Sequence, residues 1–352
     1  MKRSLSNNMI LCCALLIVLQ RTPTTRADEA SEALKKYQTQ LDESIDKGLK
    51  YLAESQKEDG LFPGQYGTTT AVPALVGMAF LSKGYTPGHG PYGERINQCI
   101  DLVLSSEQQK DGKPSGHFVR TGQGKMYAHC ISILFLSEVS GMVDEERQKK
   151  LEEALARGLS LIVEAQNVKK DQNHAGGWRY EPHSGDSDLS LTGWAVMALR
   201  SGRLNGAQIP NDNIERAIEY ILRCQPRGAK GERGFSYQAY QGGKPAMTGV
   251  AILCLSLTGQ SENEMLKSAG DWMLKQDVNK RWGGSHFFYQ NYYCTQAMFQ
   301  LGGDYWDQWA AGFYELAFKN QLDDGSWGSP YNTAMTVLAL TVSYRQLPVY
   351  QR

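Results

Sequence analysis

The sequence predicts an all-α fold of paired helices, and two observations carry this prediction. First, a glutamine at the end of an amphipathic segment recurs along the chain, each time before a polar loop that contains glycine. These glutamines are Gln56, Gln108, Gln166, Gln225, Gln276 and Gln321, separated by 52, 58, 59, 51 and 45 residues. Second, each loop is followed by a segment rich in Ala, Leu, Val and Met. A period of this length suits two helices with their connections, so we expect six helical hairpins.

Residues 1–27 have the three parts of a secretory signal peptide. They have a basic start, an apolar run from Met9 to Leu19, and a polar end at Ala27. The apolar run is about half the roughly 20 residues that a membrane span requires. We therefore expect residues 28–352 to form a single exported domain, periplasmic or extracellular, without a transmembrane span.

Charge and cysteine content exclude several classes of partner. Four of the 37 basic residues lie in the signal peptide, which leaves 33 against 37 acidic residues. No basic stripe remains, so nucleic acid is not an expected partner. Five cysteines remain without a Cys-x-x-Cys pair, and we expect free, buried thiols. They are Cys99, Cys130, Cys224, Cys254 and Cys294.

The two helices of each hairpin differ in composition. The first carries frequent Lys and Glu, whereas the second is apolar on most of its circumference, as in a helix buried on nearly all sides. The second helices are expected at 68–82, 127–140, 191–201, 247–257, 292–301 and 332–343. This contrast predicts an inner ring of apolar helices inside an outer ring of amphipathic ones.

The loops between the helices have a recurring chemistry. Glycine after a helix end favours a positive φ. Such glycines stand at Gly60, Gly112, Gly177, Gly234, Gly283 and Gly325. The glutamine side chain combines a donor with an acceptor and can satisfy loop backbone groups, so we interpret it as structural. The clearest loop spans residues 175–188, where Asp186 and Asp188 stand at the expected N-cap of a helix.

The last repeat contains a complete Gln-Trp motif. Gln321, Gly325 and Trp327 match the form Q-x(2 to 5)-G-x-W, and the copies at Gln56 and Gln276 match it loosely. On these residues the chain resembles the squalene cyclase and protein prenyltransferase β-subunit repeat family over nearly its whole mature length. The resemblance implies an α6/α6 toroid with a central cavity.

The resemblance also implies a candidate acid. Cyclases of this family carry Asp-x-Asp-Asp at the start of an inner helix, and here Asp186-Ser187-Asp188-Leu189 keeps two of the three acids. Asp188 would protonate an alkene, with Asp186 or His129 supporting it, in a cyclase or isomerase acting on an apolar isoprenoid ligand. The alternative interpretation of Asp186 and Asp188 is helix capping.

Aromatic residues at the starts of the inner helices are candidates for the ligand cavity. Their π faces can stabilise a carbocation, and they can equally fill the barrel. They are Tyr66, Tyr127, Trp194, Tyr292, Tyr293 and Tyr331.

Zinc and other cofactors are not expected. The prenyltransferases of the family bind zinc through an Asp, a Cys two residues later and a distant His. Before Cys294 the Asp position holds Tyr292, and the final repeat offers no His.

Two other functions fit the same fold. One is a non-catalytic binding or scaffold toroid of the cell envelope, with a protein partner. The other is a polysaccharide-cleaving enzyme that uses a carboxylate pair. Glu181, Asp186 and Asp188, close to Trp178 and Tyr180, are the candidates for such a pair.

Overall fold

The computed structural model describes residues 32–120, 125–226, 233–278, 282–284 and 286–351. The predicted signal peptide, residues 1–27, lies outside these described residues.

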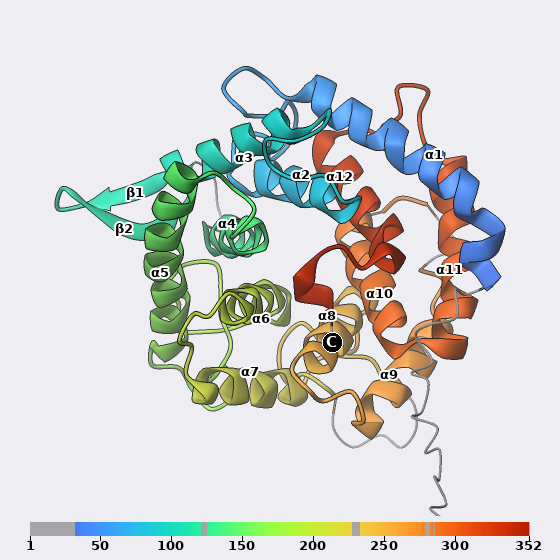
Figure 1. The fold of residues 1–352 in the computed structure, drawn as a ribbon. Coiled ribbons are helices and arrows are strands. Elements are labelled where there is room, and N and C mark those ends of the chain that lie inside the picture. Colours follow the sequence, from blue (N-terminus) through green and yellow to red (C-terminus); the bar gives the residue numbers. More distant parts are fainter. Residues whose placement is uncertain (1–31, 121–124, 227–232, 279–281, 285, 352) are drawn as a thin grey trace, which may run out of the picture.

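Helices of two kinds alternate along the chain and form two concentric rings (Figure 1). The outer helices are α1 (Glu32–Ser55), α3 (Gly93–Ser105), α5 (Glu145–Asn167), α7 (Asn211–Arg223), α9 (Glu264–Leu274) and α11 (Gly303–Lys319). The inner helices are α2 (Ala71–Ser82), α4 (Lys125–Val139), α6 (Leu189–Leu204), α8 (Pro245–Leu257), α10 (Phe287–Leu301) and α12 (Pro330–Leu340). The last inner helix, α12, contacts α1, α2 and α10, which closes the rings. The predicted all-α toroid is confirmed, and the inner helices overlap all six predicted ranges.

Burial explains why the two kinds of helix differ in composition. In α8 the eleven residues from Met247 to Leu257 are all buried, since other helices surround it. In α7 only Asn213, Ala217, Tyr220 and Ile221 are buried, and they form one stripe. An apolar stripe facing the core is what an amphipathic surface helix provides.

One loop of the expected all-α chain folds as a β-hairpin instead. Strand β1 (Glu107–Lys110) pairs antiparallel with β2 (Lys113–Phe118). Asp111 and Gly112 connect them, both with positive φ, at 52° and 74°. An Asp-Gly pair is the turn that joins two strands most readily, and it is the sequence signal for this hairpin.

Two of the repeated glutamines, Gln56 and Gln166, tie one outer helix to the next. Gln166, at the end of α5, donates through Nε2 to the carbonyls of Gly176 (2.7 Å) and Asn213 (2.9 Å), and Asn213 belongs to α7. Gln56 follows α1 and donates to the Arg95 carbonyl of α3 at 3.2 Å. The expected role of these glutamines in satisfying backbone groups is confirmed at both positions.

The loop tryptophans bond back to the outer helix that precedes them. Trp178 Nε1 donates to the Ile162 carbonyl of α5 at 2.7 Å, and Trp327 Nε1 donates to the Ala317 carbonyl of α11 at 2.9 Å. Each motif therefore fixes its loop against two outer helices.

The prediction of positive φ was wrong for two of the six loop glycines. Gly60, Gly112, Gly283 and Gly325 have positive φ, but Gly177 and Gly234 do not. These two are glycine because of close packing. A Cβ at Gly177 would lie 2.7 Å from the Tyr220 ring, and one at Gly234 would lie 2.6 Å from the Trp272 ring.

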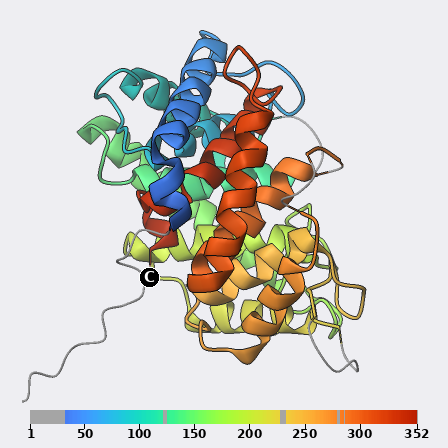
Figure 2. The same cartoon turned by 90° about the vertical axis from the view of Figure 1, so that its right-hand side faces the viewer.

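The two ends of the toroid are built differently (Figure 2). The loops from outer to inner helices gather at one end, which we call the mouth; it is formed by the first residues of the six inner helices and the loops before them. At the other end the chain continues from α12 through η1 (Val342–Tyr344) and η2 (Pro348–Tyr350). We call residues 345–351 the C-terminal strap. It contacts α6 through η2, and Val349 and Tyr350 are buried.

The five cysteines of the described residues are all free and buried, as predicted. Within the same residues, none of the helices is both long and apolar enough to cross a membrane.

Candidate functional site

Asp188 begins helix α6 at the mouth and has no solvent-exposed surface. Its backbone is extended, with φ −135° and ψ 157°, and its N–H donates to the Trp178 carbonyl at 2.9 Å. Its Oδ1 accepts the N–H of Leu191 at 3.0 Å, which satisfies one free donor of the first turn. Asp188 is therefore the N-cap of α6, as the capping interpretation expects.

Arg179 is the cation of this site and was not among the residues predicted from the sequence. Its guanidinium donates to Asp188 Oδ2 at 3.2 Å and lies 3.3 Å from Asp186 Oδ2. It also donates to the Tyr237 hydroxyl at 3.2 Å and stacks over the Tyr180 ring at 4.4 Å. Its position between Trp178 and Tyr180, directly before the acidic loop, was the available signal.

The charge state of Asp188 reflects two opposing influences. Burial is the larger one and raises the pKa of the carboxyl, because the charged form loses its hydration. Hydrogen bonds from Ser190 and Leu191 and the charge of Arg179 lower the pKa. Ser190, Leu191 and Arg179 all donate to this side chain, a set of partners that suits an ionised carboxylate.

Tyrosine hydroxyls surround this carboxylate. The Tyr127 hydroxyl of α4 bonds to the Ser190 Oγ, and Ser190 Oγ donates to Asp188 Oδ1. The Tyr289 hydroxyl of α10 donates to the Ser190 carbonyl at 3.1 Å. On the other side, the hydroxyls of Tyr180 and Tyr237 bond to each other. The mouth therefore joins four separate segments of the chain through one hydrogen-bonded group.

The predicted cavity aromatics lie in two places. Tyr127 is in the group just described, and Tyr66 and Tyr331 pair edge to face at the mouth, with ring centroids 5.5 Å apart. Three others are buried in the packed core: Trp194, Tyr292 and Tyr293. There the Trp194 ring stacks on Tyr292, with centroids 5.5 Å apart and planes 8° apart. Tyr237 and Tyr289, which complete the mouth, were not among the predicted residues.

Comparison with known proteins identifies the architecture. No family model and no curated protein matches the sequence. Among solved structures, an arginine-to-alanine variant of the type II terpene cyclase MstE from Scytonema, in complex with its substrate geranylgeranyl dihydroxybenzoate, matches with TM-score 0.61. The identity is 16%, over 89% of this chain and 100% of that chain. The chain has a terpenoid cyclase-like fold.

Other MstE structures give the same result. An aspartate-to-alanine variant with the product merosterolic acid A has TM-score 0.59, and the apo enzyme has TM-score 0.57, both at 16% identity. The alignments cover 89% and 88% of this chain and 100% and 99% of those chains. At this identity the likeness concerns the terpenoid cyclase-like toroid alone, and the chemistry depends on the residues of the site.

His129 does not support Asp188, so that expectation was wrong. The ring is fully buried on the face of α4 that packs on α5 and β2. Its Nδ1 accepts the N–H of Phe118 at 3.2 Å, and its Nε2 bonds to the Gly158 carbonyl at 3.1 Å. Burial lowers the pKa of His129 to about 3, so the ring is neutral and links two outer elements of the terpenoid cyclase-like toroid.

The metal ligands of the prenyltransferases have no counterpart in the part of the chain that the structure describes. There, no three His, Cys, Asp or Glu side chains are grouped so that they could hold a metal ion. The Cys294 thiol is buried and donates to the Pro245 carbonyl at 3.4 Å.

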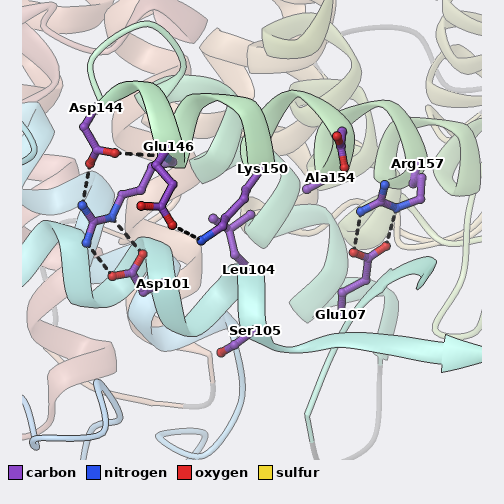
Figure 3. Close-up of a pocket in the computed structure, with 11 residues that line it drawn as sticks. Asp101, Leu104, Ser105, Glu107, Asp144, Glu146, Lys150, Ala154 and Arg157 are labelled. Carbon is purple, nitrogen blue, oxygen red and sulfur yellow. Dashed lines mark hydrogen bonds and ion pairs between the residues drawn. The ribbon is translucent and has the colours of Figure 1, made fainter. Parts of the chain in front are cut away.

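A polar groove of about 540 Å³ lies on the outside of the toroid, between α3, α5 and β1. Its cations are all paired. Figure 3 shows Lys150 with Glu146 (2.7 Å) and Arg157 with Glu107 (2.8 Å), and Arg147 pairs with Asp101 (2.7 Å). No residue of the Asp188 site lines the groove. Its pairs link outer elements, and such partly exposed pairs stabilise a fold only slightly.

Proposed function

We propose that the protein binds an apolar, isoprenoid-type ligand at the mouth of its toroid. The observation that carries this proposal is the convergence of Tyr127, Tyr180, Tyr237 and Tyr289 around Ser190 and Asp188. A few polar groups placed among aromatic rings are typical of small-molecule sites.

The size of the chain is compatible with such a ligand. The structure of the MstE variant with geranylgeranyl dihydroxybenzoate aligns with this protein over 100% of the MstE chain. A toroid of similar extent therefore accommodates an isoprenoid substrate in that enzyme. This supports the same class of ligand for the present chain.

The proposed role is binding rather than protonation of an alkene. Protonation of a carbon-carbon double bond needs a neutral, strongly donating acid. Asp188 instead accepts hydrogen bonds from Ser190 and Leu191 and pairs with Arg179, all of which stabilise its charged form. Asp186 shares the same arginine.

Cyclisation is the second candidate, and the burial of Asp188 favours it. The carboxyl has no exposed surface, and burial raises its pKa in the direction that a general acid needs. It also occupies the central position of the partial Asp-x-Asp-Asp motif.

Cleavage of a polysaccharide has less support. Such enzymes need one carboxyl as an acid and a second as a nucleophile or base. Here Glu181 pairs with Lys125 at 3.7 Å, while Asp186 and Asp188 pair with Arg179. Each of the three candidate carboxylates is paired with a cation, and no two of them stand as a free acid and a free base.

We further propose, from residues 1–27, that residues 28–352 act as one domain outside the cytoplasm. A non-catalytic scaffold that binds a protein of the cell envelope is the remaining alternative for this setting.

Incubation of the purified protein with squalene and shorter terpenoids, followed by lipid extraction and mass spectrometry, tests the proposal. We expect a bound and unchanged terpenoid. If a cyclised product forms instead, Asp188→Asn should lower its rate by about 10²-fold or more, because the amide carries no transferable proton. Asp171→Asn is the matched control: Asp171 lies in the same loop, and its carboxylate accepts the backbone N–H groups of Asn173 and His174. If no terpenoid is either retained or converted, the proposed function fails.

A further inference from the structure

The hydrogen bonds at Ser190 have a fixed direction. Ser190 Oγ carries one hydrogen and donates it to Asp188 Oδ1. The contact between Ser190 Oγ and the Tyr127 hydroxyl therefore needs the hydrogen of Tyr127. The hydrogen bonds therefore run from Tyr127 to Ser190 and from Ser190 to Asp188, and each hydroxyl hydrogen points toward the carboxylate.

Tyr289 is oriented in the same sense. Its hydroxyl contacts the Ser190 carbonyl oxygen at 3.1 Å, and a carbonyl oxygen can only accept. The hydroxyl hydrogens of both Tyr127 and Tyr289 are thus committed to Ser190. Each tyrosine oxygen keeps only lone pairs for any further partner.

On the Ser190 side of the group, Tyr127 and Tyr289 are the residues with accessible surface. Asp188 has no exposed surface and Ser190 is 4% exposed, whereas Tyr127 and Tyr289 are only partly buried. Burial raises the pKa of both hydroxyls well above its usual value, so they stay protonated and the direction of the hydrogen bonds is kept. A molecule in the mouth therefore meets acceptors on this side.

We infer that the mouth recognises a ligand whose polar end donates a hydrogen bond, an isoprenoid alcohol rather than a hydrocarbon or an ether. This inference rests on the proposed function and narrows its ligand class. An alcohol can give its hydrogen to the oxygen of Tyr127 or Tyr289. At these two oxygens an ether has no hydrogen to donate, and a hydrocarbon leaves both oxygens without a partner.

The dissociation constants of three probes of equal chain length test the inference: geranylgeraniol, its methyl ether and the corresponding hydrocarbon. They are measured by titration of the intrinsic tryptophan fluorescence. We expect the alcohol to bind about tenfold more tightly than the ether, the size of one neutral hydrogen bond. Equal affinity of the alcohol and the ether for the unmodified protein would overturn the inference while leaving the proposed function intact. If none of the three probes binds, the proposed function itself fails.

Three variants locate the contact. Tyr127→Phe and Tyr289→Phe each remove one acceptor oxygen, and we expect one of them to lower the preference for the alcohol without changing the affinity for the hydrocarbon. Tyr51→Phe, on the outer helix α1, is the matched control and should keep the preference. A tenfold preference that survives both mouth variants would place the hydroxyl elsewhere and overturn the assignment to these two tyrosines.

Discussion

Glu138 is a buried carboxyl at the end of the toroid opposite the mouth. It lies near the end of α4 with 2% of its surface exposed. One oxygen accepts from the Ser201 hydroxyl and the other accepts the N–H of Val349 in the C-terminal strap at 3.3 Å. Burial raises its pKa to about 7 from an ordinary value of 4.5, more than these bonds and the charge of Arg200 lower it.

This shift predicts how stability depends on pH. Because the folded pKa is the higher one, the fold favours protonated Glu138. The stabilisation that Glu138 contributes to the folded state is complete below pH 4.5 and is lost as the pH rises through about 7. At about 1.4 kcal/mol per pKa unit, the free energy of unfolding should fall by about 3 kcal/mol across this window. Glu138→Gln imitates the neutral acid and should remove most of this fall, as measured by urea denaturation from pH 4.5 to 8. If the free energy of unfolding depends on pH in the same way for both proteins, Glu138 is not the source of the pH dependence.

Helices α8 and α10 pack closely because one residue has no side chain. A Cβ on Gly249 of α8 would lie 2.8 Å from the backbone nitrogen of Cys294 in α10. Backbone atoms cannot move aside as a flexible side chain can, so the two helices would have to separate. The inner ring depends on this contact, since each inner helix packs on two neighbours.

Gly249→Ala should therefore destabilise the protein, although alanine is the better helix former by about 1 kcal/mol. We expect a net loss of about 1 to 3 kcal/mol, the usual cost of overpacking a core. Thermal denaturation followed by circular dichroism measures the effect. Gly185→Ala is the control, because a Cβ on this loop glycine would meet no other part of the protein within 4 Å. A Gly249→Ala protein as stable as this control would show that the helices can adjust.

Periodic elements were predictable from the sequence, and contacts across loops were not. The apolar inner helices and the cap at Asp188 depend on residues close in sequence, and both are as expected. Arg179 contacts Tyr237, and Tyr289 contacts Ser190, only because segments far apart in the sequence come together at the mouth. His129 shows the reverse case: its place at a helix start was predicted correctly, but its direction depends on how α4 packs against α5.

Closure of the ring joins residues from opposite ends of the chain. Gln321, which follows α11, donates through Nε2 to the Ser44 carbonyl and the Gly325 carbonyl, both at 2.8 Å. Its Oε1 accepts the Ser44 hydroxyl at 2.8 Å. Ser44 belongs to α1, 277 residues away in the sequence. The same glutamine that links neighbouring repeats elsewhere thus links the last repeat to the first.

Gln321→Ala should weaken the contact between the last repeat and the first more than it lowers the stability of any single helix. Loss of three hydrogen bonds at about 1 kcal/mol each predicts a fall of about 2 to 4 kcal/mol in the free energy of unfolding. Because the bonds join α1 to the loop after α11, hydrogen exchange should quicken first in α1, α11 and α12, while α5 and α6 keep their protection.

Gln208→Ala is the matched control, since that exposed side chain makes one bond to the Gly206 carbonyl within its own loop. If exchange rises evenly around the ring, the toroid opens as one cooperative unit and Gln321 is no special point of closure. If exchange rises first in α1, α11 and α12, the ring opens where its two ends meet, and the four hairpins from α3 to α10 keep their protection.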